Sequence, residues 1–227
     1  MNIPQHIVLF PDGNRRWAKG RGLKTLEGHT KGYDNLVTFA ADCQDRGVKV
    51  LTAFGFSTEN WKRSPEEVAY LMRLLEKGLF QLLDKFKTRN IRLRVIGQKD
   101  RLPDSLKKAV DIVEEETKNN TGFVLNLAIS YGGKWDILQA VQKAIKNGVS
   151  ATDIDEKSFE TLLSTSGLPD PDLVIRAGGE MRLSNFVLWQ AAYAELYFSP
   201  KMWPDFAKED FDVALAEFDR RTRRFGG

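Results

Sequence analysis

The first residues of the chain with an evident chemical use follow an apolar run at residues 7–10. Asp12 comes two residues after that run, Gly13 permits a tight turn, and Arg15 and Arg16 follow. Such a turn can present backbone N–H groups to an anion, and a helix beginning at the arginines would add a partial positive charge. A bare diphosphate would repel Asp12, so the carboxylate is suited to a divalent cation that bridges to phosphate oxygens. The same residues are also compatible with an ordinary Asp-Gly-Asn turn carrying solvated arginines.

A second polar segment follows the apolar run at residues 48–54. It combines hydroxyl, carboxylate, amide, indole and guanidinium groups, carried by Ser57, Thr58, Glu59, Asn60, Trp61 and Arg63. Ser57 and Asn60 could orient or relay a proton, and Trp61 could cover an apolar chain or a developing carbocation. The alternative is a helix cap in which Ser64 is the N-cap and Glu67 completes a capping box. Both interpretations can hold at once, and the cap would leave Asn60, Trp61 and Arg63 unexplained.

A third segment, residues 172–186, places arginines and a hydroxyl around a Gly-Gly pair. Arg176 ends an apolar run, and Arg182 and Ser184 follow the glycines. Two guanidiniums beside a hydroxyl suit a diphosphate, which they can bind through bidentate contacts. The alternative is a surface loop in which Arg176 pairs with Glu180.

Two further titratable residues could join these sites. His29 is predicted to open a helix and could donate a hydrogen bond to a phosphate, although a lone histidine is more often a surface or capping group. Glu195 lies in an apolar and aromatic stretch, where a carboxylate needs an ion pair, hydrogen bonds or a metal ion. Glu195 is therefore a candidate for a second acidic contribution to the site.

Strands and helices alternate along the chain and must position these segments. Short apolar strands are predicted at residues 6–10, 48–54, 91–96, 124–129, 172–175 and 194–198. Helices are predicted at residues 29–46, 65–89, 104–118, 134–147, 156–163 and 208–224. This alternation is typical of an α/β fold with an open, mainly parallel six-stranded sheet flanked by helices. Ligands of such sheets gather outside the carboxyl ends of the strands.

The helix predicted at residues 65–89 carries an apolar stripe in steps of three and four residues: Val68, Leu71, Met72, Leu75, Leu79, Leu82, Leu83 and Phe86. The stripe either faces the core or lines one wall of an apolar tunnel, and the pattern alone does not separate the two.

Composition narrows the class of protein. A chain of 227 residues with 42% hydrophobic residues suits one domain, residues 1–227, with a proper core. A net charge of +3 is small for a nucleic-acid binder, so no nucleic-acid partner is expected. The single cysteine, Cys43, excludes an internal disulfide. No apolar run suits a signal peptide or a membrane span, which predicts a cytoplasmic protein with at most peripheral membrane contact.

Together these residues indicate two anion sites, one divalent metal ion and much apolar helix surface. That combination suggests transfer chemistry between two phosphorylated apolar substrates. No G-x-G-x-x-G motif or P-loop is present, so no nucleotide cofactor is implied.

In this combination of motifs the chain resembles the undecaprenyl diphosphate synthase, or cis-prenyltransferase, family over residues 6–227. The segments that carry the resemblance are residues 12–18, 28–29, 56–61, 131–133, 172–186, 189–206 and 220–227. The DDxxD metal motif of the helical trans-prenyltransferases is absent from this sequence. Thr25 stands where the family often has a phosphate-binding arginine, and Pro11 replaces a more usual apolar residue.

The resemblance implies roles for individual residues. Asp12 is similar to the family's metal-binding and catalytic aspartate, and Asn60 to its proposed proton relay. The cradle for the allylic diphosphate matches Gly13, Asn14, Arg15, Arg16 and His29. The substrate-contacting loop matches Trp17, Ser57, Thr58, Glu59, Asn60, Trp61 and Arg63. The isopentenyl diphosphate site matches Arg176, Arg182, Leu183 and Ser184. Glu195 resembles the acidic residue that helps to complete the metal site across a dimer interface.

The resemblance also implies an activity. It predicts a homodimeric, Mg²⁺-dependent isoprenyl transferase that condenses isopentenyl diphosphate with an allylic diphosphate such as farnesyl diphosphate. The expected product is a Z-polyprenyl diphosphate, namely undecaprenyl diphosphate for the lipid carrier of cell-wall synthesis. The alternatives are a synthase of shorter Z-prenyl chains, a non-catalytic subunit of the family, and a metal-dependent phosphohydrolase with a water-activating base beside Asp12.

Overall fold

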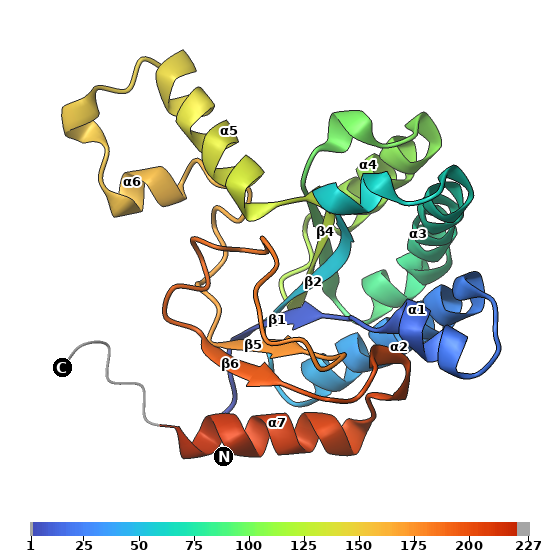
Figure 1. The fold of residues 1–227 in the computed structure, drawn as a ribbon. Helices are drawn as coiled ribbons and strands as arrows, with labels where there is room; N and C mark the ends of the chain where they lie inside the picture. The colour runs from blue at the N-terminus through green and yellow to red at the C-terminus, as the bar shows by residue number, and fades with distance from the viewer. Residues whose placement is uncertain (1, 222–227) are drawn as a thin grey trace.

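The computed structural model describes residues 2–221, and within them the chain forms a six-stranded sheet in the order β3-β4-β2-β1-β5-β6 (Figure 1). Its strands are β1 (His6–Phe10), β2 (Val50–Ser57), β3 (Ile91–Ile96), β4 (Phe123–Tyr131), β5 (Leu173–Arg176) and β6 (Glu195–Phe198). Every pair of neighbouring strands is parallel. The predicted open, mainly parallel sheet is therefore confirmed.

The helices are α1 (Asn14–Gly20), α2 (Thr25–Asp45), α3 (Pro65–Thr88), α4 (Asp104–Thr117), α5 (Gly133–Lys146), α6 (Glu156–Glu160) and α7 (Lys208–Arg220). Short 3-10 turns lie at Thr58–Lys62, Lys99–Arg101, Ala151–Asp153 and Trp203–Asp205. Helix α1 corresponds to the helix considered at Arg15 and Arg16, although it was not among the predicted helix ranges, and α2 begins four residues before its predicted start at His29. Residues 222–224 of the last predicted helix lie outside the described residues.

The order of the strands places β1 at the point where the chain reverses direction across the sheet. From β1 the chain fills one side with β2, β4 and β3, and then returns to the other side with β5 and β6. The chain therefore leaves β1 and β5 in opposite directions across the sheet, and open α/β sheets bind their ligands between such loops at the carboxyl edge. Asp12 follows β1 and Arg176 ends β5, so the ends of these two neighbouring strands place both residues at this edge.

The buried strands divide their side chains between two apolar layers because successive residues of a strand point to opposite faces. In β1, Ile7 and Leu9 join the cluster that also contains Phe39 of α2 and Leu79 of α3. Val8 and Phe10 join the opposite cluster with Tyr131, Phe186 and Val187. A strand that is covered on both faces is expected to be mainly apolar, as residues 7–10 of β1 are.

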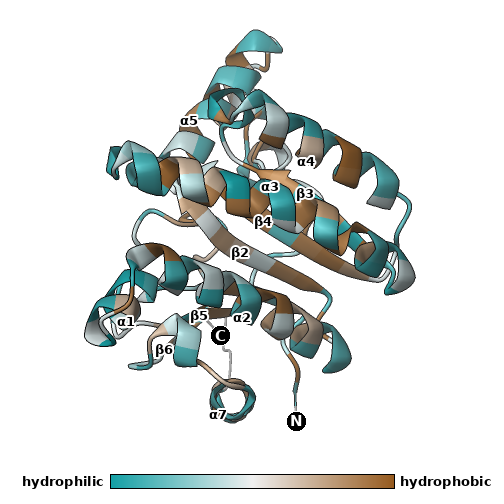
Figure 2. Ribbon diagram, turned by 90° about the vertical axis from the view of Figure 1, so that its right-hand side faces the viewer, coloured by the Kyte–Doolittle hydropathy of each residue, from teal (hydrophilic) through white to brown (hydrophobic). Residues whose placement is uncertain are grey.

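Helices α2 and α3 lie across the same face of the sheet (Figure 2). Hydrophobic residues of both helices pack in the core cluster on that face. The stripe of α3 serves both of the roles that its pattern predicted. Met72, Leu79 and Phe86 are buried in the core. Leu71 and Leu75 of the stripe line a large cavity above the sheet, together with the neighbouring Leu74.

An aromatic cluster ties the segment after β6 to α2. The indole of Trp203 is fully buried and donates a hydrogen bond to the carbonyl of Gly32 at 2.7 Å. Asn35 of α2 donates to the carbonyls of Trp203 and Phe206. The backbone N–H of Trp203 in turn donates to the carbonyl of Asp12 at 2.9 Å. This segment therefore holds α2 and the loop after β1 in a fixed relation.

His6 takes part in a buried polar chain on the other face of the sheet. Its Nδ1 donates to the carbonyl of Pro169 at 2.6 Å, so its Nε2 is free to accept from the hydroxyl of Thr52 at 2.8 Å. Asn126 donates to the same Thr52 oxygen at 3.0 Å. The arrangement requires a neutral imidazole, and burial lowers the pKa of His6 to about 4, against a smaller raising effect of its bond to Pro169 and of Asp172.

We expect His6 to reduce stability in acid. Because its pKa is lower in the folded protein than in the unfolded chain, only the unfolded chain binds a proton between about pH 6.5 and pH 4. The free energy of unfolding should fall by roughly 3 kcal/mol across that window on account of this residue. Urea denaturation at several pH values should show a shallower pH dependence in His6→Gln, which cannot titrate. Identical pH profiles for the two proteins would contradict the assignment.

Candidate active site

An ion pair between Asp12 and Arg176 joins the ends of β1 and β5. Strand register sets Phe10 opposite Arg176, and the Arg176 guanidinium donates to Asp12 Oδ2 at 2.9 Å. Only 4% of the Arg176 side chain is exposed, and its charged group lies over the ring of Phe10. Its other terminal nitrogen donates to Ser184 Oγ at 2.8 Å and to the carbonyl of Arg182. The guanidinium is thus buried, paired and fixed in direction.

Glycines allow the chain to turn tightly around this pair. Gly13 has a φ of 99°, and a Cβ at that position would lie 2.6 Å from the sulfur of Met202. Its backbone N–H donates to Asp12 Oδ1 at 2.6 Å, so both carboxylate oxygens accept a hydrogen bond. Gly178 has a φ of 91° and lies against the backbone of Asp12. A side chain at either glycine would move the carboxylate.

Glu180 holds two cations at the rim of the site. Arg16 donates to the carbonyl of Gly178 at 2.8 Å and approaches Glu180 Oε1 at 3.2 Å. Arg182 pairs with the other oxygen of Glu180, and its side chain is 61% exposed. The alternative in which Glu180 pairs with Arg176 is wrong, since Arg176 pairs with Asp12 instead.

Glu67 accepts from a second group of donors. Its Oε1 accepts from His29 Nε2 at 2.9 Å and from Arg63 at 3.1 Å, and Arg15 lies 3.8 Å away. Burial lowers the pKa of His29, although the hydrogen bond to Glu67 opposes the effect, and burial also lowers the pKa of Arg63. His29 is neutral and donates to the carboxylate. The predicted helix start at His29 is wrong, since His29 lies in the second turn of α2. Ser64 is the N-cap of α3 as predicted, and its hydroxyl accepts from the Glu67 N–H at 3.3 Å. The Glu67 carboxylate, however, accepts from His29 and Arg63 instead of closing a capping box.

The loop after β2 is held by reciprocal hydrogen bonds. The Ser57 N–H donates to Asn60 Oδ1 at 3.1 Å, and the Asn60 N–H donates to Ser57 Oγ at 3.2 Å. The carboxylate of Glu59 accepts from Asn185 at 3.0 Å. Burial alone would raise the pKa of Glu59, but this and other hydrogen bonds lower it on balance. Asn60 is therefore fixed in orientation, as a proton relay would need to be.

A cavity of about 1190 Å³ connects these groups with apolar residues of α2 and α3. The predicted site residues along its wall are Asp12, Gly13, Asn14, Arg15, Arg16, His29, Ser57, Glu59, Asn60, Arg63, Arg176 and Ser184. The side chain of Asn14 lies against Gly32, and its Oδ1 is buried with no hydrogen-bond partner. One end of the cavity is polar and mostly cationic, and the other end is formed by leucines.

Several predicted site residues do not line this cavity. Trp17 points to Asp205, to which its indole donates at 2.7 Å. Trp61 donates to Ser130 Oγ at 2.9 Å and packs in the core against Phe56. Thr58 packs against Gly132, and Leu183 packs against the second apolar cluster. Arg182 reaches the site only through Glu180 and its own carbonyl.

Glu195 lies away from Asp12 within the same chain. It begins β6 opposite Leu173, which is opposite Ile7, so it lies near the amino-terminal half of β1. Its carboxylate accepts from Arg221 at 2.9 Å. Among residues 2–221, no group of three or more His, Cys, Asp or Glu side chains could hold a metal ion.

The donors that are present suit Mg²⁺. This ion is commonly bound by one or two carboxylates together with substrate phosphates and water, and does not require a cage of protein ligands. Asp12 offers a carboxylate that is 40% exposed at the cationic end of the cavity. Asp12 could therefore hold Mg²⁺ together with a bound diphosphate.

Some residues that organise the site were missed in the sequence. Glu67 was interpreted as part of a cap, although its spacing of four residues from Arg63 was a signal of an ion pair on one helix face. Glu180, Lys19, Tyr33 and Asn185 were not assigned to the site, and no local pattern marks them.

Within the part of the chain described, no helix is long and apolar enough to cross a membrane.

Comparison with known proteins gives a consistent set of relatives. A family model described as "Putative undecaprenyl diphosphate synthase" matches residues 10–226. An isoprenyl transferase of Neisseria meningitidis is 46% identical over 99% of this chain and 90% of that protein, and one from Bacillus thuringiensis is 45% identical over 99% and 89%.

Two solved structures are similar over nearly all of both chains. Lavandulyl diphosphate synthase from Lavandula x intermedia, in complex with dimethylallyl diphosphate, has a TM-score of 0.95 and 40% identity, covering 99% of this chain and 98% of its own. A probable undecaprenyl diphosphate synthase from Campylobacter jejuni has a TM-score of 0.83 and 36% identity, covering 100% of both chains.

We expect Glu67→Ala to destabilise the protein, because His29 and Arg63 would lose their shared acceptor in a mostly buried setting. Urea denaturation should show a loss of roughly 1–3 kcal/mol in the free energy of unfolding. Glu66→Ala is the matched control, since Glu66 is exposed in the same first turn of α3 and should change stability little. Equal effects of the two substitutions would contradict the role of Glu67.

Proposed function

The chain belongs to the undecaprenyl diphosphate synthase family, and we propose that it condenses isopentenyl diphosphate with an allylic diphosphate to give Z-polyprenyl diphosphates. One observation carries this proposal: a single cavity has arginines and Asp12 at one end and leucines of α2 and α3 at the other. Two diphosphate groups fit the cationic end, and a prenyl chain fits the apolar end. A phosphohydrolase would have no use for the leucine-lined end.

The hydrogen-bond donors at the polar end form two groups that suit two diphosphates. Arg176 and Ser184 form the group beside Asp12, and we assign it to isopentenyl diphosphate. Arg15, His29 and the loop at Gly13 form the group assigned to the allylic diphosphate. Groups fixed in advance stabilise the charge that develops on a departing diphosphate without reorganising during the reaction. They also hold the isopentenyl double bond close to the allylic carbon that it attacks.

The proton that leaves isopentenyl C2 needs an acceptor or relay near the polar end of the cavity. Asn60 lines that end and is held by its hydrogen bonds with Ser57, which supports its assignment as the relay. Asp12 would hold Mg²⁺, which when bound neutralises charge on the departing diphosphate. We therefore propose that the enzyme depends on Mg²⁺. We also propose that it acts in the cytoplasm, as the sequence predicts.

A second copy of the chain is part of the proposal. On α5, Leu138, Val141 and Ile145 form one exposed stripe, with side chains 62%, 40% and 73% exposed. This helix and α6 project from the rest of the chain (Figure 1). Exposed apolar stripes of this kind mark protein contacts. We propose that the stripe belongs to a homodimer interface, and that any contribution of Glu195 to a metal site is made to the partner subunit.

Product length has two candidates. The family resemblance predicts undecaprenyl diphosphate, and the similarity to a probable undecaprenyl diphosphate synthase supports it. A shorter Z-prenyl product is favoured by the apolar end of the cavity, behind which only about 50 Å³ of space remains between α2 and α3. A long product would bring the protein into peripheral contact with a membrane.

The activity is tested with labelled isopentenyl diphosphate and dimethylallyl, geranyl or farnesyl diphosphate, followed by chromatography of the dephosphorylated products. We expect Mg²⁺-dependent elongation that EDTA abolishes. Asp12→Asn should lower kcat by at least about a hundredfold, because it removes the carboxylate charge that would hold Mg²⁺ beside the departing diphosphate. Asp34→Asn, at an exposed position of α2, is the control. Phosphate release without elongation, or near wild-type turnover of Asp12→Asn, would contradict the proposal.

The interface is tested by light scattering after size-exclusion chromatography. Ile145→Asp should convert a dimer to a monomer, since a charge in an apolar interface is costly to bury. Val213→Asp is the matched control, because Val213 on α7 is 57% exposed and lies outside the proposed interface. A dimer that survives Ile145→Asp would place the contact elsewhere, and a monomeric wild type would exclude it.

A further inference from the structure

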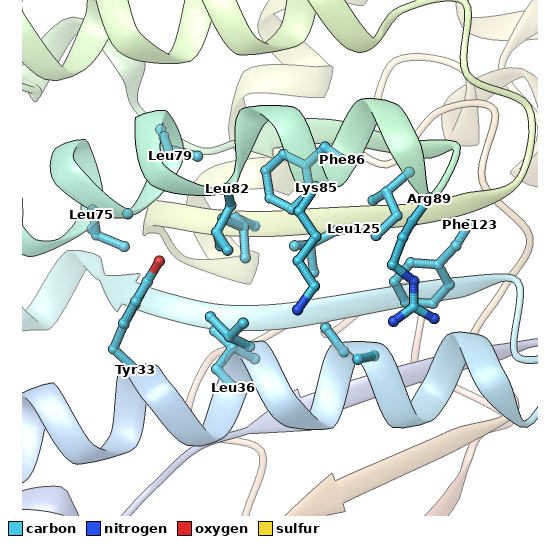
Figure 3. A pocket seen from close by; sticks show the side chains of 16 residues that line it. Tyr33, Leu36, Leu75, Leu79, Leu82, Lys85, Phe86, Arg89, Phe123 and Leu125 are labelled. Carbon is cyan, nitrogen blue, oxygen red and sulfur yellow. The ribbon is translucent and has the colours of Figure 1, made fainter.

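The large cavity and a small apolar cavity meet at three side chains. Tyr33 and Leu36 of α2 and Leu75 of α3 line both cavities. On the far side, the small cavity continues between the two helices past Leu82 and Phe86 and toward Lys85 and Arg89 (Figure 3). The floor is formed by strand residues that include Phe123 and Leu125. At these three side chains the diphosphate cavity therefore borders further apolar space.

Tyr33 spans the distance between the two helices at this point. In Figure 3 its hydroxyl points from α2 toward α3. A Cβ built at Gly78 of α3 would lie 2.3 Å from that oxygen and 2.6 Å from the ring carbon that carries it. The ring therefore abuts the backbone of α3, and it does so only because residue 78 has no side chain. Leu36 and Leu75 flank the ring without crossing the gap in this way.

The Tyr33 hydroxyl is buried and has no hydrogen-bond partner. Burial, with a smaller effect of Asp34, raises the pKa of Tyr33 to about 12, so the phenol is neutral. A hydroxyl without a partner costs free energy in the folded state, where phenylalanine would not incur this cost. The hydroxyl therefore contributes no bond that explains the ring's position, and the contact between ring and helix is steric.

We propose that Tyr33 is the residue at which growth of the prenyl chain stops. The proposal rests on the proposed function and deepens it. A chain that lengthens from the diphosphate end advances along the leucines until its tail reaches the ring. The next condensation would push the tail into the space behind, which measures about 50 Å³. On a scale where one water needs roughly 10–15 Å³, that space holds only a few methyl-sized groups, less than one further isoprenoid unit.

The proposal predicts longer products when the ring is removed. In the labelled assay, Tyr33→Ala should shift the main product upward by at least one isoprenoid unit relative to the wild type. Tyr33→Phe is the matched control and should keep the wild-type product length, because the ring that blocks the space remains. Leu82→Ala enlarges only the small cavity, so by itself it should leave product length unchanged. Combined with Tyr33→Ala, it should lengthen the product beyond that of the single variant.

The outcomes separate the two proposals. A wild-type protein that forms no elongated product would overturn the proposed function, and the role of Tyr33 with it. Elongation by the wild type with an unchanged product in Tyr33→Ala would overturn the role of Tyr33 alone. A longer product from Leu82→Ala alone would also overturn it, since the chain would already pass the ring. If thermal unfolding shows that Tyr33→Ala is not folded, Tyr33→Leu, which fills the core but cannot span the gap, decides with the same expected shift.

Discussion

The arrangement of the site depends on one interaction, the ion pair of Arg176 with Asp12 at the carboxyl edge of the sheet. A guanidinium that is 4% exposed requires a partner, because an unpaired charge at that depth would be costly. The partner is available because β1 and β5 are adjacent and in register, with Phe10 opposite Arg176. The glycine turn after Asp12 and the backbone bond from Trp203 then hold the carboxylate in place. Strand order, loop geometry and site chemistry are thus linked through one contact.

The remaining cations are positioned by two carboxylates, Glu67 and Glu180, to which no contact with substrate is assigned. Glu67 lies between Arg63 and Arg15, and Glu180 pairs with Arg16 and Arg182. Cations this close together would otherwise repel one another, so each carboxylate lowers the cost of concentrating positive charge at the mouth of the cavity. The guanidiniums are consequently oriented before a ligand arrives, which is the condition for electrostatic stabilisation without reorganisation. The net charge of the whole chain, +3, gives no sign of this local concentration of positive charge at the cavity.

Glycines determine the shape of both ends of the cavity. At the polar end they allow tight turns beside Asp12, and at the apolar end they allow helices to approach one another closely. Asn14 lies against Gly28 and Gly32 of α2, and Tyr33 lies against Gly78 of α3. Because these glycines have no Cβ, α1 can pack directly on α2, and a tyrosine ring can extend from α2 to the backbone of α3. The cavity is therefore bounded by what the glycines admit as well as by the leucines that line it. Under the proposal for Tyr33, this helix pair would set the length of the prenyl product.

Sequence alone determined the six strands to within a few residues, the order of the motifs and the family, because continuous apolar runs and conspicuous polar loops are local signals. It also placed Asp12 and Arg176 at strand ends. Only the tertiary structure decided that Trp17 and Trp61 turn away from the cavity, that Glu195 lies far from Asp12 and that Glu67 joins His29. Hydrophobic periodicity indicates which face of a helix or strand is buried, but it does not indicate which side chains of other elements contact that face. Those partners are set by strand order and by the rotation of packed helices, which bring together residues far apart in the chain.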